Sequence, residues 1–161
     1  MGIRYYAYAF EKDETHQALA DPRAFIGEDP LADAWGFEPH AQVATVTFKQ
    51  AVPERDLLYL DKAWRPLQVL TGRTRAAFRM FEGDVTMSGL GWYPWIRALT
   101  PEEVLEVAED LRALEDETPG EGLCAGISDE DIDYALPFLS RARRFVEALA
   151  SEERGMVYMI G

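Results

Sequence analysis

The chain has 161 residues, of which 48% are hydrophobic and 12% aromatic, and it carries a formal net charge of −13. This composition indicates one globular domain over residues 1–161, and no apolar run approaches the roughly 20 residues of a membrane-spanning helix. The negative charge disfavours binding to nucleic acid or anionic membranes, and a single cysteine behind an N-terminus without a signal peptide favours a cytoplasmic protein.

The first forty residues predict a strand, a short helix and a structured loop. Ile3–Phe10 places apolar residues on both alternating faces, which is typical of a central strand covered on both sides. Glu11–Ala20 is a short helix that ends before a proline. Residues 21–40 contain several turn signals and are expected to form a loop with one helical turn near Leu31–Trp35. Val43–Phe48 alternates again and is predicted to be a half-buried strand.

The stretch Leu57–Gly72 has the longest run of apolar residues at helical spacing. The residues that this spacing places on one helix face are Leu57, Leu60, Trp64 and Leu67. Asp61 and Arg65 lie four positions apart and are expected to pair on the flank of the helix. Pro66 leaves two alternatives: a kinked helix, or a short turn that stops at Asp61 and a helix that starts again after it.

Ala76–Phe81 is predicted to be a third strand, with Gly83-Asp84 as a turn and Val85–Met87 pairing back as a hairpin. The neighbouring arginines Arg73, Arg75 and Arg79 permit three interpretations. They pair with acidic helices, they grip a small anionic ligand, or they form a nucleic-acid surface, which the net charge of −13 opposes.

Two helices and a closing strand are predicted in the last third of the chain. Thr100-Pro101-Glu102-Glu103 is a capping box that starts a helix ending near Glu115, and residues 116–127 are expected to be a loop. A second helix runs from about Asp129 to Ser151 and is kinked or restarted at Pro137. Its predicted apolar stripe is Ile132, Leu136, Leu139, Phe145 and Leu149. Gly155 ends it, and Met156–Ile160 is a strand.

Strands and helices are interspersed without strict alternation. This order predicts a single α+β domain in which an antiparallel or mixed sheet has helices packed against it.

We find no catalytic, cofactor or metal-binding motif in the sequence. His16, His40 and Cys124 do not have the spacing of a zinc site. The acidic run that starts at Asp129 has the beginning of a calcium loop, but Tyr134 occupies the position that requires glycine. An acidic helix start explains this run better. We therefore predict no metal and no cofactor, and favour a protein that is not an enzyme.

The run Gly91–Trp95, with the sequence GWYPW, is an aromatic cluster between a glycine and a proline. Such a cluster forms a pocket, an interface anchor or an ordinary core corner. A pocket is expected to lie between this run and the 21–40 loop, with Asp61, Arg65 or Arg97 at its polar end. The candidate ligand- or partner-binding residues are Asp61, Trp64, Arg65, Trp92, Tyr93, Trp95 and Arg97.

The segment Leu60-Asp61-Lys62-Ala63-Trp64, followed by Leu67 and by Leu70-Thr71-Gly72, resembles the LDxxKxW…LTG signature of the YfbM-like bacterial proteins of unknown function. The spacing to the last part is one residue shorter here, and Gln68 stands where that family usually has histidine. The resemblance implies a small cytoplasmic α+β domain and implies no established activity.

Two functional hypotheses follow from the sequence. The first is a non-enzymatic, immunity-like or regulatory module that binds a basic protein partner, because residues 100–161 hold 16 acidic and 5 basic side chains. The same acidity is also explained by a surface that only keeps the protein soluble. The second is a small-ligand-binding protein or enzyme with an aromatic pocket near Gly91–Trp95. The oligomeric state is not determined by the sequence.

Overall fold

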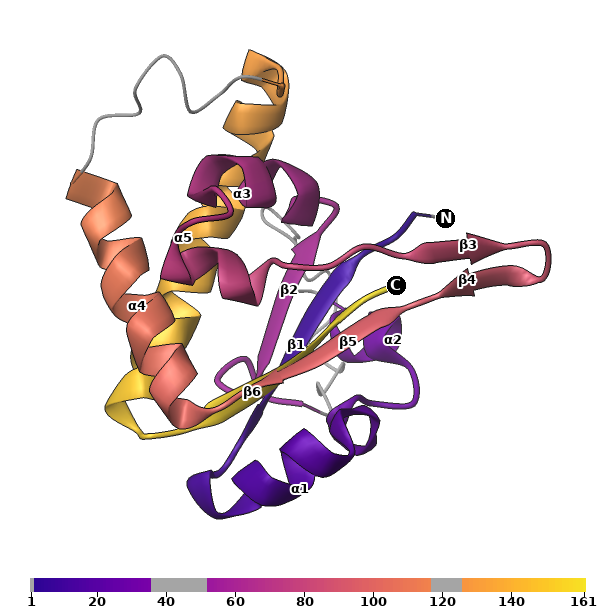
Figure 1. Cartoon of the computed structure of the whole chain (residues 1–161), viewed down its shortest axis with the longest axis vertical. Coiled ribbons are helices and arrows are strands. Elements are labelled where there is room, and N and C mark those ends of the chain that lie inside the picture. The colour runs from indigo at the N-terminus through magenta and orange to yellow at the C-terminus, as the bar shows by residue number, and fades with distance from the viewer. Residues whose placement is uncertain (1, 36–51, 117–125) are drawn as a thin grey trace, which may run out of the picture.

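A computed structural model describes residues 2–35, 52–116 and 126–161 (Figure 1). Its main sheet has four antiparallel strands in the order β2-β1-β6-β5. These strands are β1 (Tyr5–Phe10), β2 (Leu57–Asp61), β5 (Trp95–Leu99) and β6 (Gly155–Ile160). The predicted α+β class, with an antiparallel sheet, is confirmed.

The helices cover both faces of the sheet (Figure 1). The α-helices are α1 (Thr15–Ala20), α2 (Pro30–Asp33), α3 (Trp64–Thr71), α4 (Pro101–Asp116) and α5 (Asp129–Ser151). The 3-10 helices are η1 (Lys12–Glu14), η2 (Pro22–Phe25) and η3 (Ala76–Met80). The large core lies between one sheet face and α3, α4, α5 and η3, whereas α1 and α2 cover the other face.

Strand β1 is a central strand, as its sequence predicts. It pairs with β2 on one side and with β6 on the other. Tyr5 and Ala7 point into the large core, and Tyr6 and Tyr8 pack on the opposite face. Because both faces of the strand are covered, an uninterrupted apolar run is the sequence that fits it.

The prediction of a helix over Leu57–Gly72 is wrong in its first part. Leu57–Asp61 is one of the two edge strands of the sheet, and its side chains alternate between the two cores. Asp61 then adopts a positive φ of 45° that ends the strand, and α3 begins at Trp64. The predicted break at Asp61 and the restart are thus correct. Pro66 sits in the first turn of α3, where its missing N–H removes no helical hydrogen bond.

The predicted strand Ala76–Phe81 and its hairpin are also wrong. This segment is the 3-10 helix η3, and β3 (Thr86–Ser88) pairs instead with β4 (Gly91–Tyr93). Side chains from elsewhere satisfy the backbone of η3. The Asp110 carboxylate accepts from the Ala77 N–H at 2.8 Å, and the Tyr5 hydroxyl donates to the Met80 carbonyl at 2.7 Å. Such partners are set by tertiary packing and leave no periodic signal in the segment itself.

Most predictions for the last third are confirmed. The Glu103 N–H donates to Thr100 Oγ1 at 3.2 Å, and the Thr100 N–H donates to the Glu103 carboxylate at 2.9 Å, which is the expected capping box. Helix α5 continues through Pro137 without ending. Of the predicted stripe, Phe145 and Leu149 are buried, Ile132 and Leu139 are half-buried and Leu136 is exposed. The other buried residues of the helix are Ala135, Phe138, Ala142 and Val146. The predicted strand Val43–Phe48 and nearly all of the predicted loop 116–127 lie outside the described residues.

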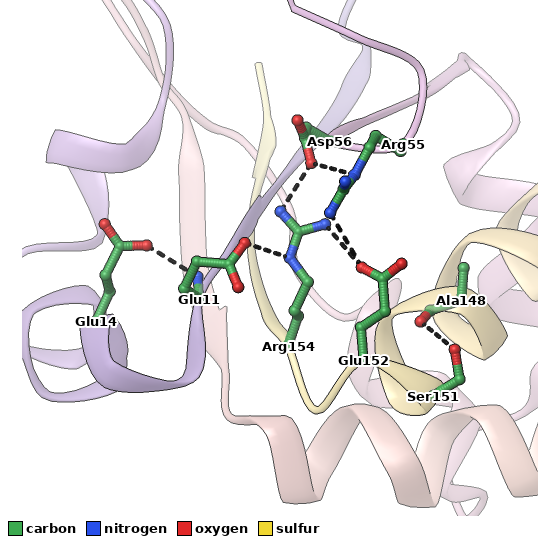
Figure 2. Close-up of polar contacts among 8 residues, drawn as sticks. All are labelled: Glu11, Glu14, Arg55, Asp56, Ala148, Ser151, Glu152 and Arg154. Atoms are coloured by element: carbon green, nitrogen blue, oxygen red, sulfur yellow. Dashed lines mark hydrogen bonds and ion pairs between the residues drawn. The ribbon is translucent and has the colours of Figure 1, made fainter.

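A buried arginine joins three segments that are distant in the sequence (Figure 2). The side chain of Arg154 is 6% exposed, and its Nη2 donates to Asp56 Oδ1 at 2.7 Å. Glu11 Oε1 lies 2.8 Å from Nε at an angle that makes this contact an ion pair rather than a hydrogen bond. Glu152 lies 3.4 Å from Nη1. The cluster ties the end of β1 and the turn before β2 to the end of α5.

Candidate functional site

The hairpin β3–β4 projects from the body of the molecule, and the chain returns from it through Pro94 into β5 (Figure 1). We refer to residues 85–95 as the aromatic arm. Its strands pair Thr86 with Tyr93 and Met87 with Trp92, so the last two side chains are cross-strand neighbours. Two glycines around Leu90 form the turn.

The aromatic arm exposes large apolar side chains. Leu90 at the turn is 98% exposed, and the others are between 39% and 68% exposed. These others are Met87, Trp92, Tyr93 and Trp95. The arm contains no charged residue. Aromatic residues and methionine without nearby charge are the composition of the centre of a protein–protein interface. The core-corner interpretation of this run is therefore wrong for Trp92 and Tyr93.

The base of the arm is held firmly. The Trp95 ring covers Gly83, where φ is 139° and a Cβ would overlap the ring. The Gln68 side-chain amide donates to the Phe81 and Gly83 carbonyls at 2.6 and 2.8 Å. An isolated two-stranded ribbon is marginally stable, so these contacts set the direction in which the arm points. Gln68 was not among the predicted site residues, and no local signal marks it, since its partners are backbone atoms thirteen and fifteen residues away.

Two of the predicted site residues pair with acidic side chains near the base of the aromatic arm. Arg65 is exposed on α3, donates to Asp84 at 3.1 Å, and stacks over the Trp64 ring with 4.8 Å between its Cζ and the ring centroid. Arg97 on β5 pairs with Glu82 and lies 3.6 Å from Glu103. The predicted pairing of Arg65 with Asp61 is wrong, because Asp61 belongs to β2 and not to the same helix.

Asp61 and Trp64 have structural contacts. Trp64 is buried, and its indole N–H donates to the Ile3 carbonyl at 3.3 Å. The Asp61 carboxylate accepts from the Tyr134 hydroxyl at 2.6 Å, and from Arg4 and Tyr59 at 3.0 Å each. Partial burial opposes ionisation, but these donors outweigh it and lower the pKa of Asp61 below its usual value. Asp61 therefore links the N-terminus, β2 and α5 through hydrogen bonds.

The basic patch after α3 pairs with α4, as one of its three interpretations predicts. Arg75 Nη2 lies 2.9 Å from Asp110, and Arg79 pairs with Glu106. Both arginines are thereby neutralised by acids of α4, which leaves the nucleic-acid interpretation without support.

A cavity of about 300 Å³ lies between β2 and α5. None of the predicted site residues lines it, so the structure adds no support to a ligand pocket at Gly91–Trp95. Within residues 2–35, 52–116 and 126–161, no group of three or more His, Cys, Asp or Glu side chains is placed to hold a metal ion. In the same ranges, no helix combines the length and the apolar character needed to cross a membrane.

No protein-family model matches the chain, and neither a curated protein nor a solved structure matches it. The resemblance to YfbM-like proteins stays a prediction from the motifs around Leu60–Gly72. The aromatic arm and the charges of the chain are the features that bear on its function.

Proposed function

We propose that this chain is a non-enzymatic protein-binding module, immunity-like or regulatory in kind, that inserts its aromatic arm into an apolar cleft of a basic protein. The observation that carries the proposal is the exposed, uncharged arm on a firmly held base. The YfbM-like relationship and a cytoplasmic location belong to the same proposal and are supported by the sequence motifs and by the single cysteine.

The side chains of the aromatic arm are suited to binding a partner rather than to stabilising the core. Its exposed Leu90, Trp92 and Tyr93 contribute little to the core, yet burying them against a partner would release much apolar surface from water. Tryptophan and tyrosine are the residues that most often dominate binding energy at interfaces. A rigid base also lowers the entropy lost on binding, since the arm is already oriented.

Charge decides which kind of partner fits. Two copies of a chain with a net charge of −13 repel each other, whereas a basic protein is attracted and steered toward it. The acids near the arm base are already paired, so the attraction acts over the whole chain and the arm itself supplies the apolar contact.

The test is capture of partners on immobilised protein from lysate of the source cells, followed by reconstitution with the purified partner. Four baits are compared: the native chain, Trp92→Ala, Leu90→Ser and the control Leu19→Ser. Leu19 is 54% exposed on α1, so this control makes the same chemical change away from the arm. We expect a basic protein that binds the native chain and the control, and that binds Trp92→Ala about thirtyfold more weakly, a loss of about 2 kcal/mol.

Three results contradict the proposal. In one, every bait retains the same partners, so binding does not use the arm. In another, the partner that depends on the arm is acidic or binds equally at low and high salt, so charge does not select it. In the third, the chain alone is a dimer by light scattering and Trp92→Ala makes it a monomer, so the arm binds a second copy.

A further inference from the structure

The cavity between β2 and α5 combines apolar walls with two arginine side chains. Its volume is about 300 Å³, which suits a small organic molecule. The lining residues that matter here are Glu54, Leu58, Arg141, Arg144 and Phe145. Leu58 and Phe145 are buried in the core between the sheet and α5, and supply apolar surface from the strand and from the helix, respectively. We call this site the Arg141 cavity.

Arg141 and Arg144 differ from the other arginines of the last helix region. Arg143 pairs with Glu115 at 2.6 Å, and Arg112 of α4 pairs with Glu147 at 3.3 Å, so the side of α5 that meets α4 is neutralised. Arg141 and Arg144 make no hydrogen bond or ion pair with any residue in the described ranges 2–35, 52–116 and 126–161. The chain has 29 acidic and 16 basic residues, so carboxylates are in excess and an arginine would be expected to pair with one.

The placement of these two arginines is electrostatically unfavourable. Arg141 and Arg144 are three positions apart on α5, so two like charges share one face of the helix. Burial is the largest cause that lowers the pKa of Arg141, and Arg144 lowers it further. Glu54 attracts Arg141 from beyond ion-pair distance and only partly offsets these effects. An anion between the two guanidinium groups would relieve both the desolvation and the repulsion.

We propose that the Arg141 cavity binds a small organic anion, with a carboxylate or phosphate group between Arg141 and Arg144 and an apolar body against Leu58 and Phe145. Guanidinium groups match the geometry of both oxyanions. The volume restricts the ligand to about the size of a substituted ring. Large polyanions are disfavoured by the acidic remainder of the chain. The site lies on β2 and α5 and is independent of the aromatic arm.

The test is calorimetric titration of the native chain with phenyl phosphate, benzoate, inorganic phosphate and the neutral analogue phenol. We expect saturable one-to-one binding of phenyl phosphate or of benzoate, and whichever binds identifies the preferred oxyanion. Inorganic phosphate and phenol are each expected to bind about tenfold more weakly than the preferred ligand, because phosphate lacks the apolar ring and phenol lacks the anionic group.

Variants localise the binding. Arg141→Gln and Arg144→Gln are each expected to weaken it about tenfold, whereas Arg23→Gln and Trp92→Ala leave it unchanged. Arg23 is an exposed arginine of η2, so its variant loses the same charge far from the cavity lining. Without ligand, Arg141→Gln is expected to melt at or above the temperature of the native chain, because it removes a desolvated charge. The inference is overturned if neither organic anion saturates, if phenol binds as well as they do, or if Arg144→Gln, a change at an exposed position, leaves affinity unchanged.

Discussion

Replacing Arg154 by methionine is expected to lower the free energy of unfolding by about 2 kcal/mol. Methionine keeps much of the apolar stem and removes the guanidinium group that joins Glu11, Asp56 and Glu152 (Figure 2). The loss therefore reports on the charge cluster and not on a new cavity in the core.

The magnitude follows from the exposure of the carboxylates that remain. Removing one member of a fully buried pair costs about 3–5 kcal/mol, because the other charge is left without water. Here the side chains of Asp56, Glu152 and Glu11 are 29%, 47% and 59% exposed, so water can solvate them again. The expected loss of unfolding free energy therefore comes mainly from the 2.7 Å charge-assisted hydrogen bond to Asp56, and such bonds contribute about 1.5–3 kcal/mol.

Urea unfolding at neutral pH, followed by circular dichroism, measures this effect. Glu152→Gln is the matched control, because it removes an exposed member at 3.4 Å and should cost about 0.5 kcal/mol or less. A loss below about 0.5 kcal/mol for Arg154→Met, or an equal loss in both variants, would refute the reasoning that the buried guanidinium fastens these segments.

Three further predictions follow from contacts elsewhere in the fold. The pKa of Asp61 is lower in the folded chain than in the unfolded one, so its carboxylate stabilises the fold above the unfolded-state pKa, and this contribution disappears as pH falls through the folded-state pKa. In urea titrations, Asp61→Asn should therefore cost about 1–2 kcal/mol at neutral pH and little at about pH 2. Burial raises the pKa of Tyr5 and Tyr158, so stability is expected to fall above about pH 10, with phenolate absorbance appearing together with loss of circular dichroism. Trp64→Ala should cost about 3–5 kcal/mol, whereas Trp92→Ala should change the unfolding free energy by less than about 0.5 kcal/mol.

The elements that were correctly predicted from the sequence have local causes. The capping box at Thr100–Glu103 satisfies backbone groups within one turn, so four residues contain all the information needed. Strand β1 is apolar on both faces because it is central. These signals do not depend on where the rest of the chain lies.

The wrong predictions concern segments whose conformation depends on distant partners. The run Leu57–Leu60 is apolar at every position, which suits a helix or a strand equally, and pairing with β1 selects the strand. Ala76–Met80 is a 3-10 helix because Asp110 and Tyr5 bind its backbone. Neither partner can be identified by the periodicity of the segment.

The candidate sites show the same division. Residue type and close neighbours suffice to predict the central strand, the starts of α4 and α5, the acidity of the chain and an aromatic cluster at Gly91–Trp95. The sequence does not reveal that Trp64 is buried while Trp92 is exposed, or that Arg143 meets an acid of α4 while Arg141 faces a cavity. The physical reason is that burial and charge pairing are set by contacts between segments far apart in the chain.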